Sequence, residues 1–532
     1  MGPPAPPSAW SPLRQPLFRD LWLASVASNV GTWMQNVGAT WLMATLTPSP
    51  LLVALMQTAT ALPVFLVGLP AGALADVVDR RRVLLFTQAW MLAAAAVLGA
   101  LTIAGLATPW ALLALTFALG LGGAMNGPAW QAVTPELVPR VDLPAAVALS
   151  SISFNIARAV GPALGGLVVS AAGPGVCFLL NALSFLGVLA VIYRWRRPRQ
   201  ESATAGEGVL DAVRTGARYV RYAPALHAVL VRTAVFVVCA SALWALLPVV
   251  ARDQLQLGSF GYGVLLGFLG LGAVAGALAQ PRLRRRLSTD KQVVAATALF
   301  ALSTLGLGTV RFIPLLWLAM AAGGAGWMLF TSNVNVVALT AAAPWVRARA
   351  LSAYMLVFQG SFAGGSALWG VAAGRLGQPQ ALLVAALAMT VGLATAWRWS
   401  LAIDRHLDLR PAPAAGPEPR LEIEPEPDAG PVLVTVEYEV APDRATDFVR
   451  AMQEVGLLRR RNGAVQWGLF RDPANPRRFV ETYFSESWAE HLRQRERLTV
   501  ADREVEERAL AFHQADGRPP ATSHFLNALP EE

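Results

Sequence analysis

The chain has 532 residues, of which 55% are hydrophobic and only 14% are charged. A soluble protein of this length carries more charge on its surface, so the composition argues against an ordinary soluble enzyme or binding protein. The formal net charge is +9, but the arginines stand between apolar runs. We therefore assign them to membrane topology and expect no nucleic-acid partner.

The cysteines and the N-terminus narrow the class further. Only Cys177 and Cys239 are present, both within apolar runs, so we expect no disulfide framework, no metal site and no cofactor. The first twenty residues are rich in proline and lack the short apolar core of a cleavable signal. Residues 1–15 are predicted to be disordered, and the apolar run that follows is taken as a true membrane span.

Apolar runs of about 20 residues recur between Leu21 and Trp397, and each can cross a ~30 Å hydrocarbon core as a helix. In lipid such a run must be helical, because its backbone polar groups have no other partners. Two six-helix halves are predicted, at 16–195 and 226–402, joined by a connection at 196–225. The expected cores are 20–44, 50–75, 83–106, 108–131, 145–171, 175–195, 226–251, 260–280, 290–309, 312–339, 350–374 and 379–402.

The connections between these spans alternate in basic charge. Arginines follow spans two, four and six, beginning with Arg80 and Arg140, and the second half continues the alternation. The opposite connections carry single arginines at most. Because basic loops remain in the cytoplasm, this asymmetry predicts a multi-pass protein of the bacterial inner membrane with both termini in the cytoplasm.

The two halves also share a sequence repeat. The segment GALADVVDRRR begins at Gly72 and GALAQPRLRRR begins at Gly276, an offset of 204 residues with seven of eleven positions identical. Two similar halves around a central axis are typical of transporters that hold the substrate at the interface between the repeats.

At this point the chain resembles the major facilitator superfamily. The signature after span two is matched by Gly72, Asp76, Arg80 and Arg81, whereas Val77 replaces a basic residue and Asp79 a glycine. Span five is similar to the glycine-rich motif of antiporter branches. Over about residues 16–402 the pattern is most similar to the enterobactin-exporter-like branch. This resemblance implies export of a small molecule by alternating access, with protons as the coupling ion.

The resemblance implies that Gly72, Asp76, Arg80 and Arg81 form a charged latch of the inner gate; the alternative is a topology anchor. Arg158 is a candidate to bind substrate or a proton-relay carboxylate, because an intramembrane arginine is costly to bury; the alternative is a structural arginine. The other substrate or coupling candidates are the polar residues Gln35, Asn36, Glu136, Asn155, Asn333, Asn335 and Gln359. The small or bent positions of span five, expected to pack helices closely, are Gly161, Pro162, Gly165 and Gly166.

The pattern changes after span twelve. A Pro- and Glu-rich linker at 403–430 precedes a soluble domain predicted at 431–515 and a tail at 516–532. Alternating residues from Val432 predict a strand, and the order β-α-β-β-α resembles the ferredoxin-like antibiotic-biosynthesis-monooxygenase domain, whose members often pair their sheets as dimers. His491 and His513 are interpreted as isolated surface histidines. We expect a regulatory or self-associating appendage rather than an enzyme.

The sequence thus predicts an all-α membrane protein with the major facilitator fold and a small C-terminal α+β domain. The leading function is efflux of a small amphipathic molecule, such as a siderophore or a drug, across the lipid bilayer. Two alternatives remain open. One is an importer of the same fold, and the other is a bifunctional protein whose C-terminal domain binds or oxidises a ligand.

Overall fold

The computed structural model describes residue 8 and residues 10–195, 218–401, 408–412, 425–514 and 518–528, and for residues 69 and 73–77 it describes the backbone only. The chain divides into two compact units. The first unit comprises Met1–Thr204, Leu230–Val334 and Met355–Ser400. The second comprises Ala205–Val229, Asn335–Tyr354 and Leu401–Glu532.

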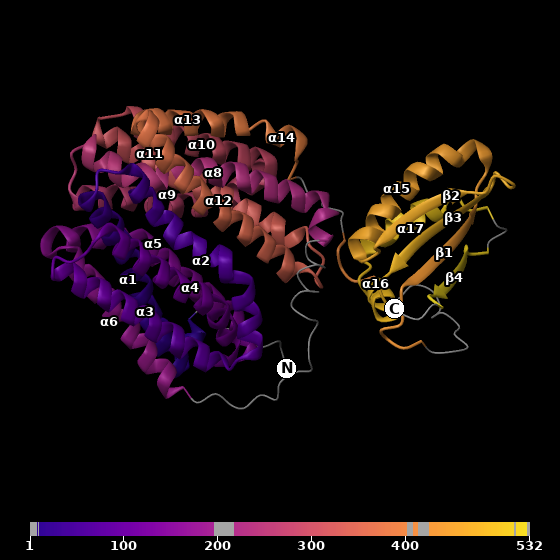
Figure 1. Ribbon diagram of the computed structural model, residues 1–532, viewed down its shortest axis with the longest axis horizontal. Coiled ribbons are helices and arrows are strands. Elements are labelled where there is room, and N and C mark those ends of the chain that lie inside the picture. The colour runs from indigo at the N-terminus through magenta and orange to yellow at the C-terminus, as the bar shows by residue number, and fades with distance from the viewer. Residues whose placement is uncertain are drawn as a thin grey trace. The chain divides into compact units, whose positions relative to one another are not determined.

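Six long helices follow one another in the first half of the membrane region (Figure 1). They are α1 (Pro16–Leu46), α2 (Pro50–Val77), α3 (Arg80–Ile103), α4 (Pro109–Leu137), α5 (Leu143–Ala172) and α6 (Pro174–Arg194). Several begin with proline, which has no amide hydrogen to leave unbonded in the first turn and already holds a helical φ. A short 3-10 turn, η1 (Ser11–Arg14), lies within the segment predicted to be disordered, and the Ser11 hydroxyl donates to Asp142 at 2.5 Å.

Six further helices form the second half: α8 (Pro224–Asp253), α9 (Ser259–Arg286), α10 (Thr289–Thr309), α11 (Ile313–Thr340), α12 (Arg347–Leu376) and α13 (Gln378–Gly392). Span twelve was predicted to continue to residue 402, but α13 ends at Gly392 and a short α14 (Thr395–Arg398) follows. The arrangement of six plus six long helices predicted from the sequence is confirmed in the described residues.

Ten of the described helices are long and apolar enough to cross a membrane. The helices α1 and α12 are not among these ten, although they are 31 and 30 residues long. Both carry charged residues in their first two turns, such as Arg19 and Asp20 in α1 and Arg347 and Arg349 in α12. Their lengths exceed the roughly 20 residues that a bilayer requires.

The repeated arginine segments differ in local structure. In the first half α2 ends at Val77 and α3 begins at Arg80, because the Asp79 side chain caps α3 by accepting from the amide of Arg82 at 3.0 Å. In the second half α9 continues to Arg286, and Ser288 caps the next helix by accepting from the amide of Lys291. The repeated arginines therefore begin a helix in one half and end a helix in the other.

The C-terminal part of the second unit contains β1 (Val432–Glu439), α15 (Ala445–Asn462), β2 (Gln466–Arg471), β3 (Arg478–Ser485), α16 (Trp488–Glu496), α17 (Val500–Leu510) and β4 (Ala521–Leu526). The strands form one antiparallel sheet in the order β2-β3-β1-β4, with Val436 opposite Glu481 on β3 and Thr522 on β4. With its helical crossovers this is the ferredoxin-like arrangement.

Alternate residues of β1 are buried, as the period of two predicts. Val436 and Tyr438 pack against Phe448 and Met452 of α15, and Ala509 of α17 completes this core. Figure 1 shows the strands beside these helices. Strand β4 lies in the segment that the sequence analysis assigned to a tail, and it pairs with β1 along its whole length.

Candidate functional site

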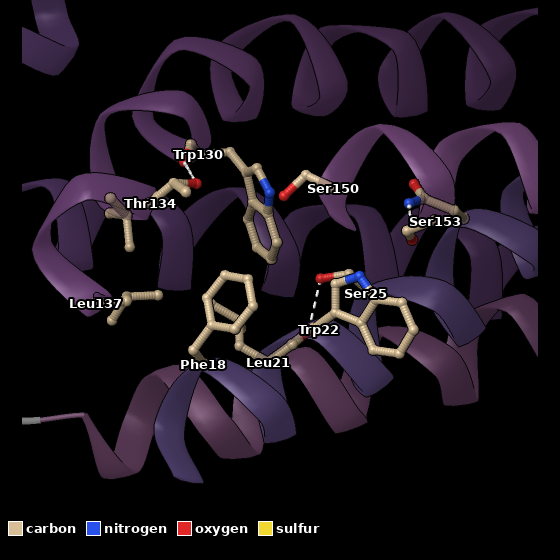
Figure 2. Close-up of a pocket in the computed structure, with 11 residues that line it drawn as sticks. Phe18, Leu21, Trp22, Ser25, Trp130, Thr134, Leu137, Ser150 and Ser153 are labelled. Carbon is tan, nitrogen blue, oxygen red and sulfur yellow. Dashed lines mark hydrogen bonds between the residues drawn. The ribbon is translucent and has the colours of Figure 1, made fainter. Parts of the chain in front are cut away.

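A pocket opens among α1, α4 and α5, near the end of the helices where α2 ends and α3 begins, which we call the motif end (Figure 2). Its empty space, counted out to open solvent, is about 430 Å³. The lining residues are Phe18, Leu21, Trp22, Ser25, Asn29, Trp130, Val133, Thr134, Leu137, Ser150 and Ser153.

Hydrogen bonds hold several lining side chains in place. The indole of Trp22 donates to the carbonyl of Leu149 at 2.9 Å, and the amide of Asn29 donates to the Ser153 hydroxyl at 3.2 Å. Figure 2 shows the rings of Phe18 and Trp130 projecting into the same space. The described lining offers aromatic faces, hydroxyl groups and one amide, and none of its residues is ionisable. Such a lining suits an amphipathic molecule that has flat apolar parts and a few hydrogen-bonding groups.

The polar residues proposed from the sequence do not line this pocket. A signal for it was nevertheless present, because Trp22, Ser25 and Asn29 recur at a spacing of three and four residues and therefore share one face of α1. The sequence analysis considered polar residues one at a time, without asking which of them share a helix face with aromatic residues.

The arginines of the repeated motif reach different helices. Arg80 donates to the Glu136 carboxylate at 2.7 Å and to the carbonyl of Ala132 at 3.2 Å, both on α4. Arg81 donates to the carbonyls of Ile192 and Tyr193 at 3.1 and 2.6 Å, at the end of α6. The side chain of Asp76 lies outside the described residues. Gly72 is on α2, and a side chain added there would meet nothing within 4 Å.

Other predicted site residues bond locally or join neighbouring helices. The Gln35 carbonyl oxygen accepts from Asn181 of α6 at 2.5 Å, and both residues are buried. Asn155 and Asn333 each donate to a carbonyl one turn earlier in their own helices, at 2.8 Å. Three further candidates are partly buried, namely Asn36 on α1, Asn335 on α11 and Gln359 on α12.

Arg158 lies on α5 where that helix packs against α9. Its carbonyl oxygen would stand 3.2 Å from a Cβ atom on Gly270 of α9. Its side chain is partly buried, and Nε is buried without a hydrogen-bond partner among the described residues. A guanidinium is always a donor and remains charged, so an unbonded buried Nε is costly.

The glycines of α5 lie at close helix contacts. A Cβ on Gly161 would stand 2.5 Å from that of Trp33, and a Cβ on Gly165 would stand 2.8 Å from the Met34 Cα, both on α1. On the other side of α5, a Cβ on Gly166 would stand 3.0 Å from the Cα of Gly263 on α9. Pro162 is buried beside these glycines.

Several contacts join the two halves at the end opposite the motif end, which we call the far end, where α1 ends and α2 begins. Arg252 at the end of α8 donates to the carbonyl of Thr47 at 3.2 Å. The rings of Trp41 on α1 and Tyr262 on α9 stack with centroids 5.8 Å apart. Gly166 of α5 and Gly263 of α9 also approach closely at this end. All three contacts join a helix of the first half to a helix of the second.

A polar network in the second half supports Arg252. Its guanidinium donates to Asp253 at 2.5 Å, and the same carboxylate accepts from Gln378 at 3.0 Å. Gln254 donates to Gln378 at 3.0 Å and accepts from Arg311 at 2.5 Å. The network therefore connects the loops before α9, α11 and α13.

The C-terminal domain contains a buried carboxylate that is fully bonded. The Glu481 side chain accepts from Arg459 at 3.1 Å, from the indole of Trp467 at 3.0 Å and from the hydroxyl of Tyr438 at 3.2 Å. Burial and the negative charge of Glu481 raise the pKa of Tyr438 well above its usual value. Because every bond is made within the fold, we interpret this cluster as structural.

The interpretation of His491 as a surface residue is wrong. Its side chain is only 2% exposed, and neither ring nitrogen has a hydrogen-bond partner among the described residues. Burial, followed by repulsion from His524, lowers the pKa of His491 to about 4. One neighbour of the His491 ring comes from a distant part of the sequence: the ring of His524 on β4 lies 4.9 Å away, centroid to centroid. A local pattern around His491 therefore does not reveal its burial. His513 is partly exposed and accepts from the amide of Glu439 at 2.9 Å.

A family model described as "Transmembrane secretion effector" matches residues 7–531 of this chain. Among solved structures, a bacterial homologue of the human lysosomal transporter Spinster, inward-facing and unoccupied, superposes with a TM-score of 0.56 at 14% identity. That match covers 73% of this chain and 97% of the other. A transporter of the POT family superposes with a TM-score of 0.58 at 13% identity, over 72% and 96% of the two chains.

Several characterised transporters are similar in sequence. The staphyloferrin A transporter of Staphylococcus aureus is 28% identical over 30% of this chain and 41% of its own length, so the chain spans less than half of that relative. The enterobactin exporter EntS of Escherichia coli is 26% identical over 60% of this chain and 76% of its own. The multidrug efflux pump Tap of Mycolicibacterium fortuitum is 28% identical over 57% and 74%.

Proposed function

This chain belongs to the transmembrane secretion effector family of major facilitator transporters, and we propose that it exports a small amphipathic molecule by alternating access. Membership makes it a multi-pass bacterial membrane transporter. The proposal adds the direction of transport, the mechanism and the class of substrate.

One observation carries the mechanism: a hydrogen bond, a ring stack and a close glycine pair join the halves at the far end, whereas the lined pocket lies at the motif end. Arg252 and Thr47 bond across the halves at the far end. The pocket is lined from Phe18 to Asn29 on α1, close to where that helix begins. A transporter closed at one end and accessible at the other corresponds to one state of alternating access, and rocking of the halves would exchange the two ends.

The arginine asymmetry supports a cytoplasmic motif end. The pocket would then receive substrate from the cytoplasm, as an exporter requires. Reporter fusions at Thr108 and after Glu532 are expected to report periplasm and cytoplasm respectively. If both fusions report the same side, the orientation and the direction inferred from it fail together.

The pocket lining supports a substrate with aromatic or other flat apolar groups and a few polar ones. The relatives named above include a siderophore transporter, a siderophore exporter and a multidrug efflux pump. We therefore propose a siderophore or a drug-like molecule as substrate. Aromatic contacts such as Trp130 would supply most of the affinity, because a large ring buries much apolar area at low entropic cost.

The experiment is efflux from cells and uptake into everted membrane vesicles, using fluorescent drugs and ferric and iron-free siderophores. Trp130→Ala is expected to raise the half-saturating concentration about tenfold, which corresponds to about 1.4 kcal/mol. Trp110→Ala is the matched control, since Trp110 begins α4 at the far end and is 69% exposed. Accumulation by intact cells, with none by everted vesicles, would instead identify the importer of the same fold.

We propose that Gly72, Asp76, Arg80 and Arg81 form the gate latch at the motif end. The Arg80–Glu136 ion pair supports a role in fastening α3 to α4 there. Asp76→Asn is expected to lower transport while leaving membrane insertion intact. If the double variant Asp76→Asn/Arg81→Ala transports as well as the unmodified protein, the segment serves only to set membrane topology.

We propose protons as the coupling ion, on the basis of the family alone. Glu136 is a carboxylate at the motif end within a helix, and it is bonded to Arg80. Efflux that collapses with an uncoupler of the proton gradient supports this coupling, and efflux that follows a sodium gradient instead contradicts it.

For the C-terminal domain we propose self-association rather than catalysis. The outer face of its sheet is open and carries Phe470 and Phe525, which are 61% and 52% exposed. The Glu481 cluster is bonded within the fold, and no group of three metal-ligating residues occurs in the described part of the chain. Phe470→Glu is expected to reduce the mass of the detergent-purified protein to that of one chain. Oxygen consumption dependent on a ligand would favour the bifunctional alternative.

A further inference from the structure

The second unit is assembled from three separate stretches of the chain: the segment that leads into α8, the connection between α11 and α12, and the C-terminal domain. The first two pack together through a small apolar cluster that includes Tyr219, Leu226 and Val346. The hydroxyl of Tyr219 accepts from the amide of Ala343 at 3.2 Å. The rings of Tyr219 and Trp345 meet edge to face at 5.4 Å, and we call this pair the aromatic corner.

Two arginines of the C-terminal domain lie over the rings of the aromatic corner. The guanidinium of Arg497 is 4.6 Å from the centroid of Trp345, and that of Arg461 is 5.5 Å from the centroid of Tyr219. A cation over an aromatic face is attracted by the negative charge of the ring, and the attraction grows when water is excluded.

A third arginine that contacts the domain belongs to the segment leading into α8. Arg218, one residue before the aromatic corner, donates to the carbonyl of Gly463 at 2.7 Å and lies 3.5 Å from the Glu486 carboxylate. Gly463 follows α15 directly, and Arg461 is in the last turn of that helix. The end of α15 is thus contacted by both Arg218 and Tyr219.

The guanidinium groups over the corner are also bonded within the C-terminal domain. Arg497 donates to Glu490 at 2.5 Å and to the carbonyl of Asn462 at 2.9 Å, and Arg461 pairs with Asp502. Their edges therefore bond within the domain while their flat faces remain available for the rings. Such preorganisation lowers the entropy lost on contact. Lysine could not reproduce this geometry, because an ammonium has no planar face.

We propose that the aromatic corner is a docking surface for the C-terminal domain, and that docking restrains the loops it holds during transport. The chain passes directly from these loops into α8, α11 and α12, which are transport helices of the second half. Any transport step that changes the conformation of the loops has to break the contacts of Arg218, Arg461 and Arg497. The domain is therefore a brake whose release speeds that step.

The test uses the full-length chain with Arg218→Cys and Glu486→Cys, joined by a bifunctional thiol reagent about as long as the two side chains they replace. The native cysteines Cys177 and Cys239 are buried and free. We expect efficient cross-linking within one chain, and a fall in efflux of about fivefold relative to the same protein treated with a monofunctional reagent. Absence of cross-linking overturns the docking, and cross-linking with unchanged efflux overturns the restraint.

Variants of the corner separate docking from folding. Trp345→Ala is expected to slow cross-linking about tenfold, whereas Trp345→Phe, which keeps a ring face, stays near the original rate. Trp397→Ala is the control, because Trp397 is 93% exposed on α14. Equal rates in all three variants, or a Trp345→Phe variant as slow as Trp345→Ala, overturn the assignment of the ring as the docking contact.

Discussion

The guanidinium of Arg80 lies 2.7 Å from the carboxylate of Glu136, although the two residues are 56 positions apart in the chain. The contact joins the start of α3 to the last turn of α4, and both side chains are largely shielded, with exposures of 27% and 13%. A charge-assisted bond at such a site contributes about 1.5–3 kcal/mol. The repeated motif is therefore connected to a carboxylate outside the motif.

We predict that Glu136→Gln lowers efflux about tenfold, because the amide keeps the shape but loses the charge partner of Arg80. Arg80→Ala should have a similar effect, and the double variant should be no worse than either single variant. Efflux from cells with matched expression measures all three. Arg82→Ala is the control, since that side chain is exposed beside the motif. Additive losses in the double variant would contradict a coupling between Arg80 and Glu136.

We expect Arg158 to be required for transport and to lower the thermal stability of the folded protein. Its Nε is buried without a partner among the described residues, so Arg158→Leu should raise the thermal unfolding midpoint and abolish efflux. Arg158→Lys should fold normally but transport less, because an ammonium does not reproduce the planar fork. Unfolding of the purified variants and efflux by the cells are compared directly. A lower midpoint with normal efflux in either variant would make Arg158 a structural residue only.

Closure at the far end depends on a small side chain at Gly166. A Cβ there would stand 2.7 Å from the carbonyl oxygen of Ser259 and 3.0 Å from the Cα of Gly263. Gly166→Val should therefore separate α5 from α9 and lower efflux strongly. Gly374→Val is the matched control, because a Cβ on Gly374 meets nothing within 4 Å. Equal efflux by the two variants would show that the close approach has no role in transport.

Arg252 is predicted to hold the far end closed through the carbonyl of Thr47. Losing a hydrogen bond of about 1 kcal/mol should increase the open fraction about fivefold. The measurement is labelling of Ser259→Cys, a 7% exposed position at the far end, with a membrane-impermeant maleimide. Arg375→Ala provides the control, since Arg375 is an exposed arginine at the same end. Labelling that does not change with Arg252→Ala would count against this contact as a latch.

The C-terminal domain should lose stability in mild acid. His491 has an ordinary pKa of 6.5 and a folded-state pKa of about 4, so the unfolded chain binds the extra proton between these values. Stability is therefore complete above about pH 6.5 and falls by about 2 kcal/mol between pH 7 and pH 5. Urea unfolding of the full-length protein at pH 7 and at pH 5, monitored by tryptophan fluorescence, measures the change in stability. His491→Leu should flatten the dependence, and an unchanged slope would assign it to other groups.

Much of the fold was predictable because its signals are local. The length of each apolar run sets a helix, and the alternation of Val432, Val434 and Val436 sets a strand, whatever lies around them. The repeat and the arginine asymmetry then indicated two six-helix halves. Strand β4 was not predicted, because the alternation of apolar and polar residues in 521–526 is weak. These residues form a strand by pairing with β1.

The candidate site followed from contacts that no local pattern encodes. A helix in lipid is apolar on most of its surface, so it lacks the stripe that would reveal which face meets which neighbour. Only the packing of α1 against α6 shows that Gln35 bonds to Asn181, and only the packing of α1 with α4 and α5 gathers Trp22, Asn29 and Trp130 around one pocket. The sequence by itself determined the helices and their order, because backbone satisfaction in lipid is local. The tertiary structure decided their partners, because side-chain contacts depend on rotation about each helix axis.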